Sequence, residues 1–414
     1  MELKKYKLGD CLTMIENGAV IKQKKNAGGI PITRIETLSN DRFNRDRLGY
    51  ADIFDESSYS HFILDDMDLI MSHINSRTFL GRTVIYRKHG DEKIIHGMNV
   101  LRLKTDIKVL NPLYAYYYFK TNGFRTAIDH IRKDAINQSS LATSDIKNLE
   151  ILIPSIEEQS VIVSILDNLD RKIALNCAIN QNLEALAKQL YDYWFVQFDF
   201  PDENLKPYKS SGGVMKWNSL IRRDIPIDWE VMPLFDAVNV QYGFPFATEQ
   251  FTEEKTEVPV VRIRDILEGT TSAFSREKAD EKYHLNEGDV LVGMDGNFHM
   301  NLWHDNTAFL NQRCVRLRPK TNSEISSIQI LYSIKPYIKA KEQIAKGSTV
   351  GHLSDKDLKG LYLIKPVNTL TFNSRKIFDE ILAQITVKKK QILSLTMQRN
   401  QLLPLLMNGQ VTLK

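Results

Sequence analysis

The sequence IEEQSVIVSILDNLDRKIALNCAINQNLEALAKQLYDYWF, residues 156–195, decides the fold of this chain. Alternating steps of four and three residues land mainly on apolar side chains, as in the seam of a coiled coil. These positions are Ile162, Leu166, Leu169, Ile173, Asn176, Asn180, Leu183, Ala187, Leu190 and Trp194. Because the stretch lacks proline and glycine, it predicts a helix of roughly 40 residues, about 60 Å long. Such a helix needs a partner helix.

A second long helix is predicted over residues 374–408, at an offset of 212 residues. Its seam positions are Phe378, Ile381, Ile385, Lys388, Ile392, Leu395, Arg399, Leu402 and Leu406. The preceding segments also match, since residues 140–154 align with residues 352–366 at the same offset. IPITRI at residues 30–35 matches VPVVRI at residues 258–263 at an offset of 228. The chain is therefore predicted to be an internal repeat whose long helices pair antiparallel.

Each half combines short strands with one helix ahead of its long helix, so the expected fold class is α+β. In the first half, Asn111 is predicted to cap a helix that begins at Pro112. In the second half, Pro336 is expected to kink or break the corresponding helix. The predicted parts are a first α+β domain at 1–154, a central long helix at 155–199, a connector at 200–228, a second α+β domain at 229–367 and a C-terminal long helix at 368–414.

The polar seam positions Asn176, Asn180 and Lys388 have two interpretations. They could fix the register of the helix pair, as polar seam residues do in coiled coils. They could equally be polar residues that the seam tolerates.

The composition indicates two core-bearing domains and excludes bulk disorder, with 414 residues of which 43% are hydrophobic. Cys11, Cys177 and Cys314 lie far apart, and the first ten residues do not resemble a secretory signal. A cytoplasmic location is therefore expected. No apolar run approaches the roughly 18 residues that a membrane span requires. Because the net charge is only +4, any contact with nucleic acid must come from local patches.

Three motifs together resemble one protein family over essentially the whole chain. They are IPSIEEQ at residues 153–159, FDFPDENLKPYKSSGG at residues 198–213 and LPLLMNG at residues 403–409. These motifs are similar to those of the specificity subunit of type I restriction-modification systems.

The resemblance implies two target-recognition domains, separated by the long helices, that read the two halves of a bipartite DNA site. It also implies that two methyltransferase (modification) subunits and restriction subunits are partners in a defence against foreign DNA. Under this resemblance the chain is not an enzyme and holds no cofactor. S-adenosylmethionine, ATP and magnesium are expected on the partner subunits.

Isolated motifs that suggest catalysis have simpler explanations. Residues 111–114, NPLY, resemble the NPPY motif of amino-methyltransferases, but a helix cap explains them better and no glycine-rich loop accompanies them. The chain has no GxxxxGK[ST] loop. His299 and His304 lack the spacing of metal ligands and are expected in a solvated loop, so no metal site is predicted.

Candidate DNA contacts were chosen by residue type, because arginine, lysine, asparagine and glutamine read base edges and small polar residues bind phosphates. The candidates are Lys22, Lys24, Lys25, Arg34, Asn75, Arg77, Asn137, Ser139, Gln241, Arg262, Arg264, Asn297, Lys346, Ser348 and Thr349. Each has a structural alternative: a solvated turn, a helix cap, or an ion pair of Arg34 with Glu36 or of Arg262 with Asp265. The candidates for helix pairing are Leu166, Leu169, Ile173, Leu183, Leu190, Ile381, Ile385, Ile392, Leu395 and Leu402.

Two other functions fit the sequence. The paired α+β domains could form a protein-interaction scaffold, or the chain could be the recognition part of a split modification and cleavage enzyme. DNA binding in the presence of a methyltransferase partner distinguishes the first of these from a DNA-recognition subunit.

Overall fold

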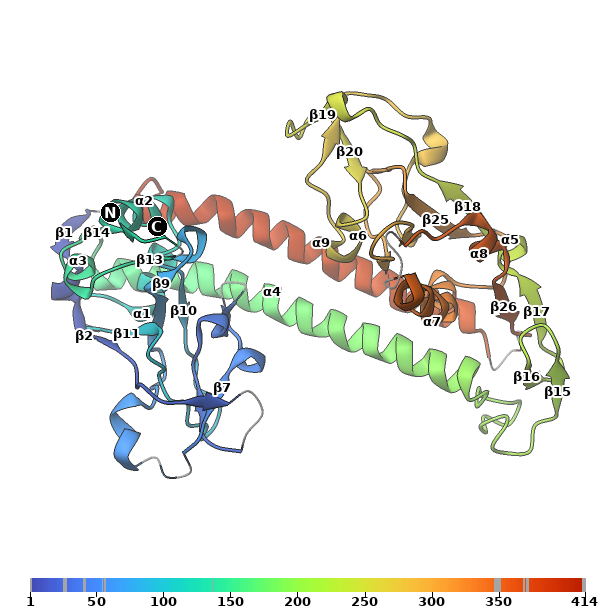
Figure 1. Ribbon diagram of the computed structural model, residues 1–414, viewed down its shortest axis with the longest axis horizontal. Helices are drawn as coiled ribbons and strands as arrows, with labels where there is room; N and C mark the ends of the chain where they lie inside the picture. The colour runs from blue at the N-terminus through green and yellow to red at the C-terminus, as the bar shows by residue number, and fades with distance from the viewer. Residues whose placement is uncertain are drawn as a thin grey trace. The chain divides into compact units, whose positions relative to one another are not determined.

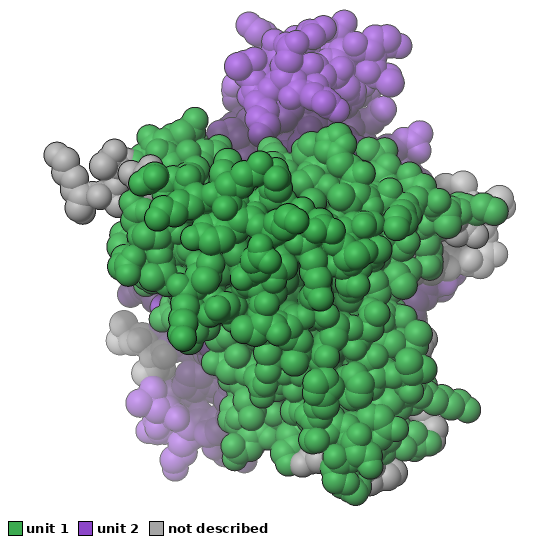
Figure 2. Space-filling view, turned by 90° about the vertical axis from the view of Figure 1, so that its left-hand side faces the viewer, with its two compact units in different colours: residues 1–172, 395–414 green, residues 173–394 purple. Residues whose placement is uncertain are grey.

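The computed structural model describes residues 2–24, 28–39, 42–53, 55, 57–136, 138–345, 351–367, 369 and 372–411 (Figure 1). The chain forms two compact units, shown in two colours in Figure 2. Unit 1 comprises residues 1–172 and 395–414, and unit 2 comprises residues 173–394. Both units contain strands and helices, which confirms the predicted α+β class. The unit boundaries differ from the predicted domain boundaries, because each long helix is divided between the two units.

A four-stranded antiparallel sheet forms the centre of each unit. In unit 1 the strand order is β10 (Thr83–Ile85), β8 (Leu69–Ser72), β11 (Val100–Thr105) and β2 (Leu12–Asn17). In unit 2 the order is β23 (Met300–Leu302), β22 (Val290–Gly293), β25 (Cys314–Pro319) and β18 (Val238–Tyr242). The two orders correspond strand by strand, which confirms the predicted internal repeat.

Smaller sheets and short helices surround each central sheet. Those of unit 1 are β1 (Lys4–Lys7) with β14 (Glu150–Ile153), β3 (Gln23–Lys24) with β7 (Gly49–Ala51) and β4 (Pro31–Ile32), β5 (Leu38–Ser39) with β6 (Arg42–Phe43), β12 (Lys133–Asp134) with β13 (Ser139–Ser140) and β9 (Ile74–Asn75), and the helix α3 (Thr143–Lys147). Those of unit 2 are β17 (Glu230–Pro233) with β26 (Tyr362–Lys365), β15 (Met215–Asn218) with β16 (Arg223–Pro226), β19 (Phe251–Thr252) with β21 (Phe274–Ser275), β20 (Val258–Val261) and β24 (Phe309–Leu310), and the helices α5 (Leu234–Ala237), α6 (Asp265–Glu268) and α8 (Asp355–Lys359).

The turn that leads into the central strand β8 of unit 1 is closed by an aspartate. The backbone N–H of Asp65 donates to Asp68 Oδ2 at 2.7 Å, and Met67 between them has a φ of 67°. Asp68 then accepts a hydrogen bond from Arg102 Nε on β11 at 2.7 Å. The turn and the neighbouring strand are thus held together by one buried carboxylate.

Unit 2 repeats this arrangement ahead of β22. The backbone N–H of Asn286 donates to Asp289 Oδ2 at 2.7 Å, and Asp289 Oδ1 accepts from Arg318 Nε on β25 at 2.7 Å. Here the left-handed position is Gly288, with a φ of 87°, a conformation that costs glycine little. The hydrogen bond that closes the turn is therefore repeated. The arginine comes from a different position on the strand, since Arg102 lies opposite Ile70, whereas Arg316 lies opposite the equivalent Leu291.

The helices beyond the central sheets differ from the predictions. In unit 1 the stretch after Asn111 forms two helices, α1 (Pro112–Tyr118) and α2 (Asn122–Ile131), because Thr121 interrupts the first and caps the second through Phe124 N at 3.3 Å. The expectation of a single helix was therefore wrong. In unit 2, α7 (Ser327–Ala345) continues through Pro336 without a break. The buried side chains on both sides of Pro336, Ile334 and Ile338, hold the helix against the core.

The two long helices are α4 (Ile156–Tyr191), which continues into a π-helical turn η6 (Asp192–Val196), and α9 (Ser374–Met407). In unit 1, Leu166 shares a hydrophobic cluster with Leu406, and Arg399 Nη1 lies 2.8 Å from Asp170 Oδ1. Residue numbers rise along α4 as they fall along α9, so the helices pair antiparallel in this unit.

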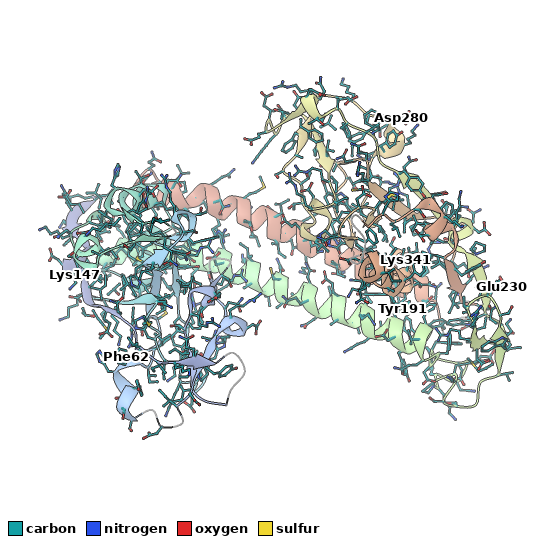
Figure 3. All side chains as sticks on the ribbon, in the orientation of Figure 1. Phe62, Lys147, Tyr191, Glu230, Asp280 and Lys341 are labelled. Atoms are coloured by element: carbon teal, nitrogen blue, oxygen red, sulfur yellow. The ribbon has the colours of Figure 1, made fainter. Side chains whose placement is uncertain are left out.

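The helices also pair antiparallel in unit 2. Lys389 Nζ lies 3.5 Å from Glu184 Oε1, and the rings of Trp194 and Phe378 lie 5.4 Å apart. Tyr191 Oη near the end of α4 donates to Ser333 Oγ of α7 at 3.2 Å (Figure 3). Within the described residues, no helix is both long enough and apolar enough to cross a bilayer.

The residues chosen for helix pairing lie at different depths. Four are buried, namely Leu166, Ile173, Ile381 and Ile385. Six are half-buried, namely Leu169, Leu183, Leu190, Ile392, Leu395 and Leu402. The polar positions Asn176 and Asn180 are buried, and Asn180 Oδ1 has no hydrogen-bond partner among the described residues. Lys388 is half-buried.

The connector at 200–228 packs into the core of unit 2, which the sequence did not indicate. Phe200 stacks on Trp229 with ring centroids 4.5 Å apart. The carboxylate of Asp199 accepts hydrogen bonds from the backbone N–H and the hydroxyl of Ser210, both at 2.7 Å. A Cβ at Gly213 would lie 2.4 Å from the ring of Tyr208, so a larger residue there would collide with the ring. The FDFPDENLKPYKSSGG motif therefore has a structural role.

Candidate nucleic-acid interface

Two of the loops predicted to contact DNA lie side by side in unit 1. Asn75 on β9 is paired with Ser139 on β13 in an antiparallel arrangement. The backbone N–H of Leu141 donates to the carbonyl of His73 at 2.9 Å and fixes the register. Asn137 lies outside the described residues.

Unit 2 pairs the corresponding loops with the same hydrogen bond. The backbone N–H of Leu353 donates to the carbonyl of Met294 at 2.8 Å. Asp295 and His352 form an antiparallel bridge next to it. The candidates Lys346, Ser348 and Thr349, which precede this bridge in the chain, lie outside the described residues. Each unit therefore holds one pair of loops in the same way.

A cleft of about 440 Å³ opens beside the paired loops of unit 2. It brings together three of the predicted contacts, Arg262, Arg264 and Asn297, although they come from two separate segments. The other lining residues are Ile263, Asp295, His299, Asn311, Gln312 and Arg313. This combination of arginine and amide side chains can donate to and accept from base edges.

The two predicted arginines of this cleft differ in their partners. Arg262 is bound to Asp265 through two hydrogen bonds, Nε to Oδ2 at 2.9 Å and Nη2 to Oδ1 at 3.0 Å. The ion pair considered as its structural alternative is therefore formed. Arg264 is exposed and makes no ion pair with another described residue.

Asp295 organises the far side of the cleft. Its carboxylate lies 2.5 Å from Arg313 Nη1 and 2.6 Å from His352 Nδ1, and its side chain is 14% exposed. Burial alone would raise the pKa of Asp295, but the hydrogen bonds from His352 and Arg313 outweigh burial and lower it. Asp295 is therefore ionised at neutral pH and holds the Arg313 guanidinium in place.

The cleft residues Asn311, Gln312 and Arg313 were missed by the sequence reasoning. They are not among the predicted DNA contacts. A signal was present, because the amide-rich NQR sequence forms the turn between β24 and β25.

Unit 1 has a cleft of about 300 Å³ with a different lining. Its charged side chains are mostly cationic and come from the segment between β9 and β10, from the turn before α2 and from α2 itself. They are Arg77, Arg82, Lys120 and Arg125, together with Asp129. The predicted contact Arg77 is 68% exposed, and its Nη2 lies 3.5 Å from Asp129 Oδ2. Such a surface suits phosphate groups.

The remaining candidates of unit 1 lie around β7. Arg34 lies next to Gln23, since a Cβ at Gly49 would lie 2.9 Å from Arg34 Cδ and 2.8 Å from Gln23 Oε1. Arg34 Nε is also 3.6 Å from Glu36 Oε2, so its alternative ion pair is present. Lys22 is exposed, Lys24 ends β3, and Lys25 lies outside the described residues.

The last candidate of unit 2, Gln241, lies on β18 opposite Arg316 of the central sheet. Its side-chain amide donates to the carbonyl of Tyr242 at 2.8 Å. Gln241 lies outside the set that lines the cleft of unit 2.

Neither catalytic-looking motif forms a reactive site. Asn111 Oδ1 accepts from the backbone N–H groups of Leu113 at 2.9 Å and Tyr114 at 3.3 Å, which makes it the predicted helix cap. Tyr114 is fully buried and cannot stack on a base. His304 is buried against α9, with Nδ1 2.9 Å from Thr386 Oγ1, so its assignment to a solvated loop was wrong. Among the described residues, no three His, Cys, Asp or Glu side chains are grouped to hold a metal ion.

Two α+β units with the same strand order and the same pair of hydrogen-bonded loops define a tandem repeat protein. The family model of the type I restriction modification DNA specificity domain matches residues 1–185 and 226–396. The chain belongs to this family, which confirms the resemblance found in the motifs.

Known relatives agree with this assignment. The putative type I restriction enzyme MjaX specificity subunit of Methanocaldococcus jannaschii is 34% identical over 230 residues, which cover 55% of this chain and 50% of that protein. The MjaIX specificity subunit of the same organism is 27% identical over 72% of this chain and 68% of its own length. The chain therefore matches about half of the first relative and two thirds of the second.

A solved structure shares the fold. The S subunit of a type I restriction-modification system from M. genitalium superposes with a TM-score of 0.58. The comparison covers 98% of this chain and 96% of that subunit, at 17% identity.

Proposed function

We propose that this chain is the DNA sequence-recognition subunit of a type I restriction-modification complex and reads an asymmetric bipartite site. The observation that carries the proposal is the pair of loops held by the same backbone hydrogen bond in both units. Each unit also has a cleft of its own, and the two clefts have different linings. A repeated scaffold with different polar surfaces suits two different half-sites. Membership of the DNA specificity family supports the assignment.

We further propose that the two clefts bind DNA in different ways, each at the half-site of its own unit. The arginines and lysine around Arg77 in unit 1 supply phosphate contacts, whereas the amides and arginines around Asn297 in unit 2 suit base edges. The near-neutral net charge makes binding depend on these local patches and on partner subunits.

The partners in this proposal are two methyltransferase subunits and restriction subunits, which hold S-adenosylmethionine, ATP and magnesium. The chain itself is a non-catalytic adaptor. Apolar side chains exposed on the long helices support docking of a protein partner, since Leu175 is 61% and Leu393 is 54% exposed in unit 2, and Met397 is 54% exposed in unit 1.

Methylation sequencing of a host that carries the complete system tests the proposal. The expected result is a methylated site with two unlike parts and an unspecified spacer. Arg264→Ala should change recognition at one part of the site only, because Arg264 belongs to unit 2. Arg77→Ala removes a proposed phosphate contact, so it should weaken binding to all duplexes about equally. A continuous or palindromic site, or no DNA binding by the complex at moderate salt, would overturn the proposal and favour the scaffold function.

A further inference from the structure

The turn that carries Arg313 is unusually constrained. Arg313 has a φ of 65°, a left-handed conformation that is costly for a residue with a Cβ. The turn rests directly on Gly243, where a Cβ would lie 1.8 Å from the carbonyl oxygen of Asn311. The backbone N–H of Gln312 also donates to the carbonyl of Phe244 at 2.8 Å. The backbone therefore holds the Arg313 side chain in a defined direction despite its cost.

The guanidinium of Arg313 is also fixed by a carboxylate from a separate segment of the chain. Its Nη1 lies 2.5 Å from Asp295 Oδ2, and the other carboxylate oxygen lies 2.6 Å from His352 Nδ1. Asp295 and His352 belong to the paired loops, whose bridge sets the position of the carboxylate. A guanidinium held this way loses little further entropy when it binds a ligand.

Arg313 keeps most of its binding capacity free. Its side chain is 66% exposed, and a guanidinium has five N–H donors in a planar fork. Arg262 in the same cleft is different, because two of its nitrogens are bound to Asp265 and its side chain is 23% exposed. The cleft thus contains one arginine that is oriented but available.

The surroundings of Arg313 match the edge of a base pair better than a phosphate. The negative charge of Asp295 offsets its positive charge, which weakens simple attraction to phosphate. The neighbouring amides of Asn297 and Gln312 both donate and accept hydrogen bonds. In the major groove, an arginine fork pairs with O6 and N7 of guanine, and amides pair with adenine.

We propose that Arg313, oriented by Asp295, reads a guanine in the half-site bound by unit 2. This inference rests on the proposed function and assigns one specificity-determining residue within it. Asp295 is a positioning residue that acts through Arg313. Asn297 and Gln312 lie where they can contact the adjacent base pairs.

The test uses the full-length chain in complex with its methyltransferase subunits. Methylation sequencing of the wild-type complex defines the site, and duplexes with every single base-pair change in that site are then assayed for binding at fixed salt. Arg313→Ala should abolish discrimination at one G·C pair, a loss of roughly 5- to 150-fold. Discrimination at all other positions should persist.

Three further variants make the result specific. Arg313→Lys keeps the charge but removes the planar fork of donors, so it should lose the same discrimination. This variant replaces Arg313→Ala in the test if the alanine variant does not fold. Asp295→Asn should reduce discrimination at the same pair while overall affinity changes less. Arg276→Ala removes an exposed arginine of unit 2 that is paired with Glu254 outside the cleft, and it should leave discrimination unchanged.

Two outcomes overturn the inference without touching the proposed function. One is a uniform loss of affinity across all duplexes, together with a slope of log K against log salt concentration that is smaller by about one. This result marks a phosphate contact. The other is loss of discrimination at an A·T pair or at no pair. If the wild-type complex itself shows no preference among duplexes, the proposed function fails instead.

Discussion

In both units the aspartate that closes the turn before a central strand is paired with an arginine, but the arginines come from different strand positions and have different surroundings. In unit 1, Asp68 and Arg102 are almost fully enclosed, with 3% and 2% of their side chains exposed. In unit 2, Asp289 is 1% exposed but Arg318 is 30% exposed. The clefts differ as well, since the charged groups lining unit 1 are mostly cationic and unit 2 is rich in amides. The repeat therefore preserves the framework of the sheet while its solvent-facing chemistry varies.

The largest effect that distinguishes the units is expected at the helix seam. Leu166→Asp should destabilise unit 1 by more than about 4 kcal/mol, because an unpaired charge would replace a fully buried leucine. Hydrogen exchange measured by mass spectrometry should show lost protection in residues 1–172 and 395–411.

Leu175→Asp is the matched control on the same helix, because Leu175 is 61% exposed. It should change the free energy of unfolding by no more than about 0.5 kcal/mol. Equal loss of protection throughout unit 2 in the Leu166 variant would show that the two units do not unfold separately.

The next prediction compares how much each of the two ion pairs contributes to the free energy of unfolding. Arg102→Ala should cost about 3–5 kcal/mol, because it leaves the carboxylate of Asp68 buried without its partner. Arg318→Ala should cost about 1.5–3 kcal/mol, since water already reaches this arginine. Denaturant unfolding of both variants measures the difference. Equal costs would mean that the burial of the arginine does not decide the strength of the pair.

The last comparison concerns the response of the units to acid. Burial is the main reason why the pKa of His96 in unit 1 falls to about 4. Burial is likewise the main reason why the pKa of His304 in unit 2 falls to about 3. An unfolded histidine has a pKa of about 6.5. At pH values above this pKa, each histidine is neutral in both the folded and the unfolded chain, and its full contribution to the free energy of unfolding is present.

As the pH falls below about 6.5, the unfolded chain gains protons that the folded chain does not take up. Each histidine should then reduce the free energy of unfolding by about 1.4 kcal/mol per pH unit until its folded pKa is reached. His96→Gln and His304→Gln should each flatten the slope between pH 6.5 and 5 by about one proton. Unchanged slopes in denaturant titrations would show that these histidines become protonated without unfolding.

Much of the framework could be predicted from the sequence. The seams of Leu166 and Ile385 repeat over many turns, so the long helices and their pairing were identified from periodicity alone. The break between α1 and α2 was missed because its cause is local, a single Thr121 cap within a helix-forming stretch. The packing of the connector was missed because Phe200 meets Trp229 only through tertiary structure.

The cleft residues were harder to predict, because ion pairing and exposure depend on the folded chain. Arg262 and Arg264 look equivalent in the sequence, but only Arg262 is bound to Asp265. Arg313 is absent from the predicted contacts, and the side chain that holds it, Asp295, lies 18 residues earlier in the chain. Residue type alone could not separate an arginine that stabilises the fold from one that is free to bind.

The division of the long helices between the units also has a consequence for biosynthesis. Unit 2 is one continuous stretch, whereas unit 1 needs residues 395–411, which leave the ribosome about 220 residues after Lys172. At 5–20 residues per second, this delay is on the order of 10 to 45 s. During that time Leu166 lacks its neighbours from α9 and exposes apolar surface. We therefore expect unit 1 to complete its folding after unit 2, although its strands are made first.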